Sequence, residues 1–179
     1  NAASANYPGG MAELKQRAIA ENVQYIETML RSMLPFGWAK TMLAAPVDRL
    51  QPGSGDVEIQ AAFASSFDAL ASDADTATAI AQYLDALDAD SAGIDDANFT
   101  MRYQAYVVRG FSRSAVFSGL YASFVAAKAG RRLVGVNIVG PENGIVSMRD
   151  YDLHMRMFAF LKKKFPEVRL SLHAGELAL

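Results

Sequence analysis

The sequence predicts an α/β protein in which parallel strands alternate with helices. Four short segments near residues 23, 99, 133 and 169 are rich in β-branched, aromatic and aliphatic residues, which is typical of strands. The stretches between them carry apolar residues at helical spacing. A composition of 51% hydrophobic and 20% charged residues over 179 positions is that of a globular protein with a substantial core.

The amino-terminal region predicts one helix and the first strand. After a flexible start over residues 1–10, apolar residues recur on one side of a short helix over residues 11–20. Residues 23–29 alternate in the manner of a strand. Pro35 and Gly37 are then expected to interrupt regular structure.

The next region predicts a pair of helices. Residues 56–90 are rich in Ala, Ser, Asp and Leu and divide near residues 72–75. Asp56 and Asp75 are placed as N-caps of the two helices, because a short acidic side chain can accept a hydrogen bond from a free N–H of the first turn. Residues 91–98 are expected to form a polar loop.

Two further strands flank the most apolar helix. Residues 99–109 alternate as a strand that Gly110 ends. The helix that follows is expected to be capped by Ser112 and ended by Gly130. Residues 133–139 are apolar almost throughout, as expected for a parallel strand covered on both faces.

The carboxyl-terminal region predicts a loop, a helix and a last strand. Residues 140–144 form an abrupt loop, and Asp150 is a candidate N-cap for a helix that Pro166 ends. Residues 169–173 are expected to be the fourth strand.

Helical crossovers between successive strands predict parallel, right-handed connections. A complete (β/α)₈ barrel usually needs about 250 residues. The chain therefore predicts either a small open sheet or a barrel with pieces missing.

The segment after the last predicted strand carries the clearest chemical signal. His173 ends the strand and Glu176 follows three residues later, with Gly175 between them. Because Gly175 lets the chain turn, both side chains can converge on the crevice where parallel α/β proteins place their sites. Imidazole suits zinc, and a carboxylate can act as a general acid or base. The alternatives are a structural histidine and an exposed loop carboxylate.

Four stretches, in this order, resemble the adenosine deaminase family, including its secreted growth-factor-like branch. They are Tyr25-Ile26-Glu27, Val107-Val108-Arg109, Gly135 to Glu142, and His173-Ala174-Gly175-Glu176. The resemblance extends from about Met11 to Glu176. It implies that the four predicted strands are the second to fifth of a TIM-type (β/α)₈ barrel, and that residues 1–179 form a single, partial domain of a metal-dependent hydrolase.

The resemblance also implies an activity, which is the zinc-dependent hydrolytic deamination of adenosine or a related purine nucleoside to inosine and ammonia. His173 would be a zinc ligand, and Glu176 would protonate a purine ring nitrogen while zinc-bound hydroxide attacks the carbon that bears the amine. Gly140 would offer its backbone N–H to the purine, with a strand-ending turn as the alternative. Arg109 could orient carboxylates such as Glu142, or be a structural ion-pair partner.

Two other polar residues, Glu27 and His154, receive structural interpretations, and the role of a third, Asn137, is left open. Asn137 stands where the family often has an acidic residue. Glu27 is interpreted as a buried structural carboxylate. His154 lies within a helical pattern and is interpreted as a packing or surface residue.

The chain lacks several ligands that the family would supply. These are a His-x-His pair on the first barrel strand, and a further histidine and an aspartate from later strands. The only histidines are His154 and His173, and a catalytic zinc site usually has three protein ligands. We therefore expect a fragment that is inactive alone and that self-associates through open barrel edges.

The composition excludes several kinds of site and argues against several classes of partner. The absence of cysteine excludes disulfides, thiolate metal sites and a cysteine nucleophile, and leaves the compartment open. A net charge of −2 argues against nucleic acid, and no apolar run approaches the roughly 20 residues of a membrane span. The alternatives to a deaminase are a related hydrolase acting on another purine or a nucleotide, a small-molecule-binding module with an anion-binding loop at residues 140–144, and a growth-factor-like interaction module. Glu142 and Asp150 would repel a phosphate at that loop.

Overall fold

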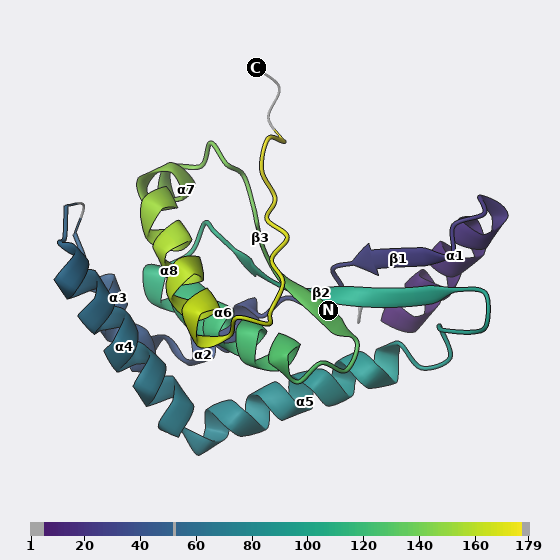
Figure 1. Cartoon of the computed structure of the whole chain (residues 1–179), viewed down its shortest axis with the longest axis horizontal. Coiled ribbons are helices and arrows are strands. Elements are labelled where there is room, and N and C mark those ends of the chain that lie inside the picture. Colours follow the sequence, from purple (N-terminus) through teal and green to yellow (C-terminus); the bar gives the residue numbers. More distant parts are fainter. Residues whose placement is uncertain (1–5, 52, 177–179) are drawn as a thin grey trace.

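The computed structural model describes residues 6–51 and 53–176 and confirms a parallel α/β architecture. Its sheet has three parallel strands in the order β1-β2-β3 (Figure 1). They are β1 (Tyr25–Thr28), β2 (Thr100–Val108) and β3 (Leu133–Val139). Each lies within a predicted strand segment, and β3 has the predicted bounds.

Helices cover one face of the sheet, and no helix of the described residues covers the other. Along β2, buried residues such as Tyr103 and Ala105 alternate with partly exposed ones such as Gln104 and Tyr106. The partly exposed set shares its face with Glu27 on β1, whose Cα partner is Arg102, and with Asn137 on β3, whose Cα partner is Tyr106. The uncovered face is therefore polar.

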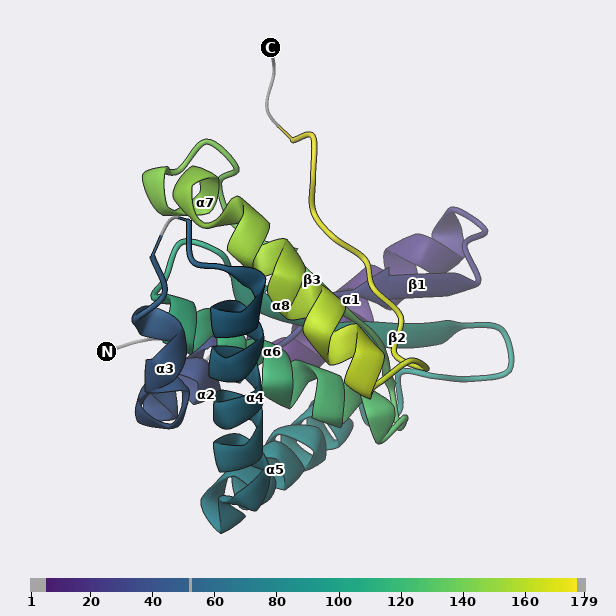
Figure 2. The same ribbon diagram turned by 60° about the vertical axis from the view of Figure 1, so that its left-hand side comes forward.

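The helices form the second layer. They are α1 (Tyr7–Ala20), α2 (Leu34–Ala39), the 3-10 helix η1 (Thr41–Ala44), α3 (Ala45–Asp48), α4 (Asp56–Ser72), α5 (Ala74–Asp90), α6 (Arg113–Lys128), α7 (Ile145–Arg149) and α8 (Tyr151–Lys164). Helix α6 packs on β2 and β3 and also contacts α2, α4, α5 and α8. Figure 2 shows α8 passing over α6, with α4 and α5 on the outside. None of the helices in the described part of the chain is long and apolar enough to cross a membrane.

The core is centred on α6. Twelve of its residues are buried, which explains why its sequence is apolar around most of its circumference. Aromatic rings join it to its neighbours, with ring centroids 5.2 Å apart for Phe63 and Phe117 and 5.6 Å apart for Phe63 and Phe160. These contacts hold α4, α6 and α8 together and give the sheet a fixed support.

The expectation that Pro35 and Gly37 break regular structure was wrong, because both lie in α2. Pro35 occupies the first turn, where its missing N–H is not needed. Gly37 is buried, and a Cβ there would collide with the carbonyl oxygen of Ala115 on α6. Glycine therefore permits the close approach of α2 and α6.

Helix starts agree with prediction only in part. Ser112 caps α6 as predicted, and it accepts a hydrogen bond from the backbone N–H of Ala115 at 3.3 Å. Asp73, and not Asp75, caps α5 by accepting from the N–H of Thr76 at 2.8 Å.

Three other predicted starts also differ. Gly55, and not Asp56, occupies the N-cap position of α4. Asp150 precedes α8 as predicted, but its carboxylate pairs with Arg113 and Arg149 instead of capping the helix. Residues 7–10 belong to α1 and not to a flexible start, while residues 1–5 lie outside the described part.

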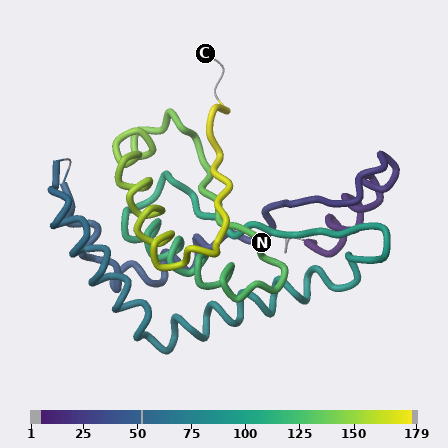
Figure 3. The backbone as a smooth tube through the Cα atoms, in the orientation of Figure 1, coloured from purple at the N-terminus to yellow at the C-terminus, as the bar shows by residue number. Residues whose placement is uncertain are grey.

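The fourth predicted strand, over residues 169–173, does not form as a strand. One parallel bridge joins Leu170 to Val136, through bonds of 3.0 Å from Val136 N–H to Arg169 and from Ser171 N–H to Val136. The backbone N–H of His173 donates a hydrogen bond to the side-chain Oδ1 of Asn137 at 3.1 Å instead of to a backbone carbonyl of β3. The ladder of backbone hydrogen bonds does not continue there. Figure 3 shows the segment leaving β3 and running outward.

Candidate functional site

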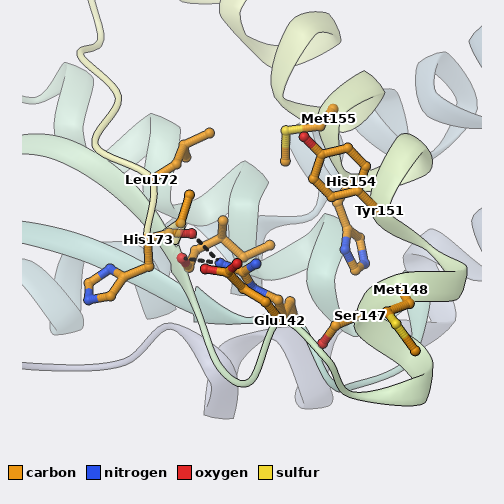
Figure 4. A pocket seen from close by; sticks show the side chains of 11 residues that line it. Glu142, Ser147, Met148, Tyr151, His154, Met155, Leu172 and His173 are labelled. Atoms are coloured by element: carbon orange, nitrogen blue, oxygen red, sulfur yellow. Dashed lines mark hydrogen bonds between the residues drawn. The ribbon is translucent and has the colours of Figure 1, made fainter. Parts of the chain in front are cut away.

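The segment over residues 170–176 separates two cavities, one over the uncovered face of the sheet and one at the carboxyl ends of β2 and β3. The His173 cavity has a volume of about 410 Å³, and its polar lining consists of Glu27, Thr28, Gln104, Asn137, Ser171, His173 and Glu176. The His154 cavity has a volume of about 480 Å³ and lies between the end of β3, α7, α8 and Leu172. Both volumes suit a small molecule. In Figure 4 the His173 ring points away from His154, toward the other side of the segment.

The structure brings His173 and Glu176 together. The imidazole Nε2 lies 3.5 Å from the Glu176 Oε1, and the two side chains are 30% and 53% exposed. Gly175 has a φ of +75°, a conformation that costs glycine little and lets the chain turn between the two residues. Both side chains line the same cavity and are accessible from it.

A series of side-chain hydrogen bonds leads to the other imidazole nitrogen of His173. Gln104 Nε2 donates to Glu27 Oε2 at 3.1 Å, and Asn137 Nδ2 donates to Gln104 Oε1 at 2.9 Å. Asn137 Oδ1 lies 3.1 Å from both the backbone N and the Nδ1 of His173. Tyr25 O–H donates to Glu27 Oε1 at 2.8 Å. The series therefore crosses all three strands.

Sequence reasoning missed this series. The interpretation of Glu27 as a buried carboxylate was wrong, because Glu27 is exposed and lines the His173 cavity. Asn137 is 2% exposed and is the direct partner of His173. Gln104 lies in the predicted strand over residues 99–109, and its polar side chain alternates there with apolar ones. The alternation of polar residues along the strands was the sequence signal that could have indicated this hydrogen-bond series.

Arg109 and Glu142 hold the backbone of the His173 segment. Arg109 Nη2 donates to the carbonyl oxygens of His173 at 2.6 Å and Ile138 at 3.2 Å, and no ion pair joins Arg109 to another described residue. Glu142 accepts from the N–H of Glu176 at 3.4 Å. The contacts thus place Arg109 against backbone carbonyls, and not against Glu142 as the sequence suggested.

Gly140 turns the chain directly after β3. Its φ is +111°, and a Cβ would lie 3.2 Å from Val108 Cγ1. Both the conformation and the close packing favour glycine. Gly140 is not among the residues that line either cavity, so its proposed contact with a purine stays a prediction.

His154 is packed inside the protein, as one of its two interpretations required. It is 2% exposed, and its Nε2 has no hydrogen-bond partner within the described chain. Burial lowers the pKa of His154 to about 4, although Asp150 acts in the opposite direction. The imidazole is therefore neutral at pH 7.

Asp150 is the main charged group beside His154. Burial alone would raise the pKa of Asp150, but hydrogen bonds from Arg149 and Arg113 outweigh it and lower that pKa to about 2. Asp150 therefore remains a carboxylate when His154 is neutral, and its charge is already paired.

The described residues do not make a complete zinc site. Within residues 6–51 and 53–176, no group of three or more His, Asp or Glu side chains is placed to hold a metal ion. His173 offers one imidazole, whereas a catalytic zinc usually has three protein ligands. These residues could therefore hold zinc only together with ligands from elsewhere.

Comparisons of the chain with models of known families, with curated proteins and with solved structures found no match.

Proposed function

We propose that this chain forms part of the active site of a zinc-dependent hydrolase that deaminates adenosine or a related purine nucleoside. The observation that carries the proposal is the pairing of His173 and Glu176 in one polar cavity over the uncovered face of the parallel sheet, beside the carboxyl end of β1. Parallel α/β proteins place their catalytic groups at this end of the sheet.

The proposal gives each residue a distinct task. His173 would provide one nitrogen ligand, and the remaining zinc ligands would come from residues outside this chain. Glu176, in its acid form, would donate a proton to a ring nitrogen of the purine. Arg109 and Glu142 would keep the backbone of both residues in place, and Gly140 would direct its N–H toward the base.

The finer fold assignment belongs to the same proposal. The three strands and the segment over residues 169–173 would be the second to fifth strands of a TIM-type barrel. Support comes from the parallel order, from helices that cover one face only, and from polar residues on the uncovered face, which would be the barrel interior.

One observation favours a second candidate, a non-catalytic small-molecule-binding module. The His154 cavity has apolar walls formed by Ile138, Met148, Met155 and Leu172, with polar groups at its ends, as small-molecule sites commonly do. Binding there would be unaffected by Glu176→Gln, whereas deamination would be lost.

The test compares the 179-residue chain with the longer protein that we propose as its parent. Zinc content and adenosine-to-inosine conversion are measured for both. We expect both properties in the longer protein and neither in the chain alone. Turnover by the chain alone, or a longer protein without zinc and turnover, would overturn the proposal.

A further inference from the structure

We propose that Glu27, Gln104 and Asn137 form a positioning relay that keeps His173 in its Nδ1–H tautomer. The neutral imidazole then carries no proton on Nε2, and the Nε2 lone pair faces Glu176 and the His173 cavity. That the lone pair serves a metal rests on the proposed function, whereas the tautomer itself follows from the hydrogen bonds.

The relay starts at a group that can only accept. Both oxygens of the Glu27 carboxylate are engaged, Oε1 by the Tyr25 O–H at 2.8 Å and Oε2 by Gln104 at 3.1 Å. A carboxylate requires a donor, so the Gln104 amide must direct its NH₂ group toward Glu27. Its carbonyl oxygen is thereby turned toward Asn137.

The orientation of Asn137 is determined from both sides. The Gln104 carbonyl, 2.9 Å away, requires the NH₂ group of Asn137. The backbone N–H of His173, 3.1 Å away on the other side, requires the Asn137 carbonyl oxygen. The two requirements agree, so flipping the amide would lose both hydrogen bonds.

The imidazole must match this arrangement. Asn137 Oδ1 is an acceptor 3.1 Å from Nδ1, so Nδ1 carries the proton. Neutral histidine in water prefers the other tautomer, and the relay therefore reverses the intrinsic preference. Fixing the proton on one ring nitrogen to leave the other free is how proteins prepare an imidazole for a metal.

The burial of Asn137 strengthens its contacts in the relay. Asn137 is 2% exposed, so its hydrogen bonds to Gln104 and His173 compete little with water. The segment cannot easily move away, because Arg109 holds the His173 carbonyl at 2.6 Å. Asn137 and Gln104 are thus positioning residues that act through His173.

Nitrogen-15 NMR of the intact chain reads the tautomer directly. With only two histidines, the His173 signals are assigned by their loss in His173→Gln. Spectra are recorded at a pH of about 8.5, where imidazoles are ordinarily neutral. We expect the His173 proton on Nδ1 in the wild-type chain.

Three variants test the cause. Asn137→Leu removes the acceptor and should shift His173 toward the Nε2–H form, whereas Asn137→Asp keeps an acceptor and should retain Nδ1–H. Asn98→Leu is the matched control, because Asn98 is exposed and outside the relay, and it should change nothing.

An Nε2–H tautomer in the wild-type chain would overturn the relay, as would an unchanged tautomer in Asn137→Leu. If Asn137→Leu fails to fold, the spectra of the wild-type chain and of Asn137→Asp still test whether His173 carries its proton on Nδ1. None of these readouts needs zinc or substrate. Absence of deaminase turnover would therefore refute the proposed function and leave the relay standing. An Nε2–H tautomer would refute the relay and leave the proposed function standing.

Discussion

The two histidines of the chain lie in contrasting surroundings. His173 is 30% exposed, with Asn137 at one ring nitrogen and Glu176 near the other. His154 is buried in α8, and its Nε2 has no partner among the described residues. The first arrangement suits chemistry at the surface of a cavity, while the second makes protonation unfavourable.

The burial of His154 predicts a loss of stability in mild acid. Its pKa is about 4 in the folded chain and about 6.5 when unfolded. Because the folded pKa is the lower one, this contribution is fully present above pH 6.5 and is lost as the pH falls toward 4. The loss between pH 7 and pH 5 should be about 2 kcal/mol.

Urea unfolding at both pH values measures this effect, with His154→Leu as the comparison. The two proteins share all their other ionisable groups, so the difference between them isolates His154. The variant should lose less stability on acidification than the wild type. Equal losses in the two proteins would show that His154 is not buried in its neutral form.

Much of the residue-scale picture was accessible from sequence. His173 and Glu176 could be singled out because a glycine between them permits convergence at a strand end. The partners of His173 could not, because Glu27, Gln104 and Asn137 are far apart in the sequence and meet only through the sheet register.

At the scale of elements, the contact between α2 and α6 depends on one missing side chain. Gly37 faces the Ala115 carbonyl, and helices this close leave no room for a methyl group. Overpacking of this kind typically costs 1–3 kcal/mol. A clash with backbone is less easily relieved than one with a flexible side chain.

Gly37→Ala should therefore destabilise the fold by about 2 kcal/mol, as measured by urea unfolding. Gly10→Ala is the control, since Gly10 lies in α1 with no atom close to the added Cβ. The control should be neutral or stabilising by up to about 1 kcal/mol, because alanine favours helix. A tolerated Gly37→Ala would contradict the close approach.

Helices and strands were predicted well where the local sequence pattern determines them and poorly where tertiary contacts do. Strand β3 has the predicted bounds because its apolar run ends at Gly140. The segment over residues 169–173 has a strand-like sequence, but Asn137 captures its N–H at His173. Helix α2 was missed because Pro35 and Gly37, usual breakers, are here compatible with a helix.

At the scale of the whole molecule, the sheet has an open edge at β1. Within the described residues β1 pairs only with β2, and its Tyr25 side chain is 49% exposed. Unpaired strand edges favour association with another strand. We therefore predict that the chain self-associates.

Sedimentation velocity over a range of concentrations measures this association against a monomer mass of 19.3 kDa. Tyr25→Lys places a charge on the edge strand and should weaken association. Met42→Lys, a similar change on η1 at a residue 82% exposed, should not. A monomer at every concentration would mean that the edge is protected.

The most direct test of the central claim is the rate of adenosine deamination by the proposed longer protein with and without Glu176→Gln. Glu167→Gln is the matched control, because Glu167 is an exposed carboxylate of the loop after α8. Loss of a general acid typically lowers the rate 10²- to 10⁴-fold, and we predict a loss of about this size for Glu176→Gln alone. Equal rates in Glu176→Gln and Glu167→Gln would contradict the assignment of this site.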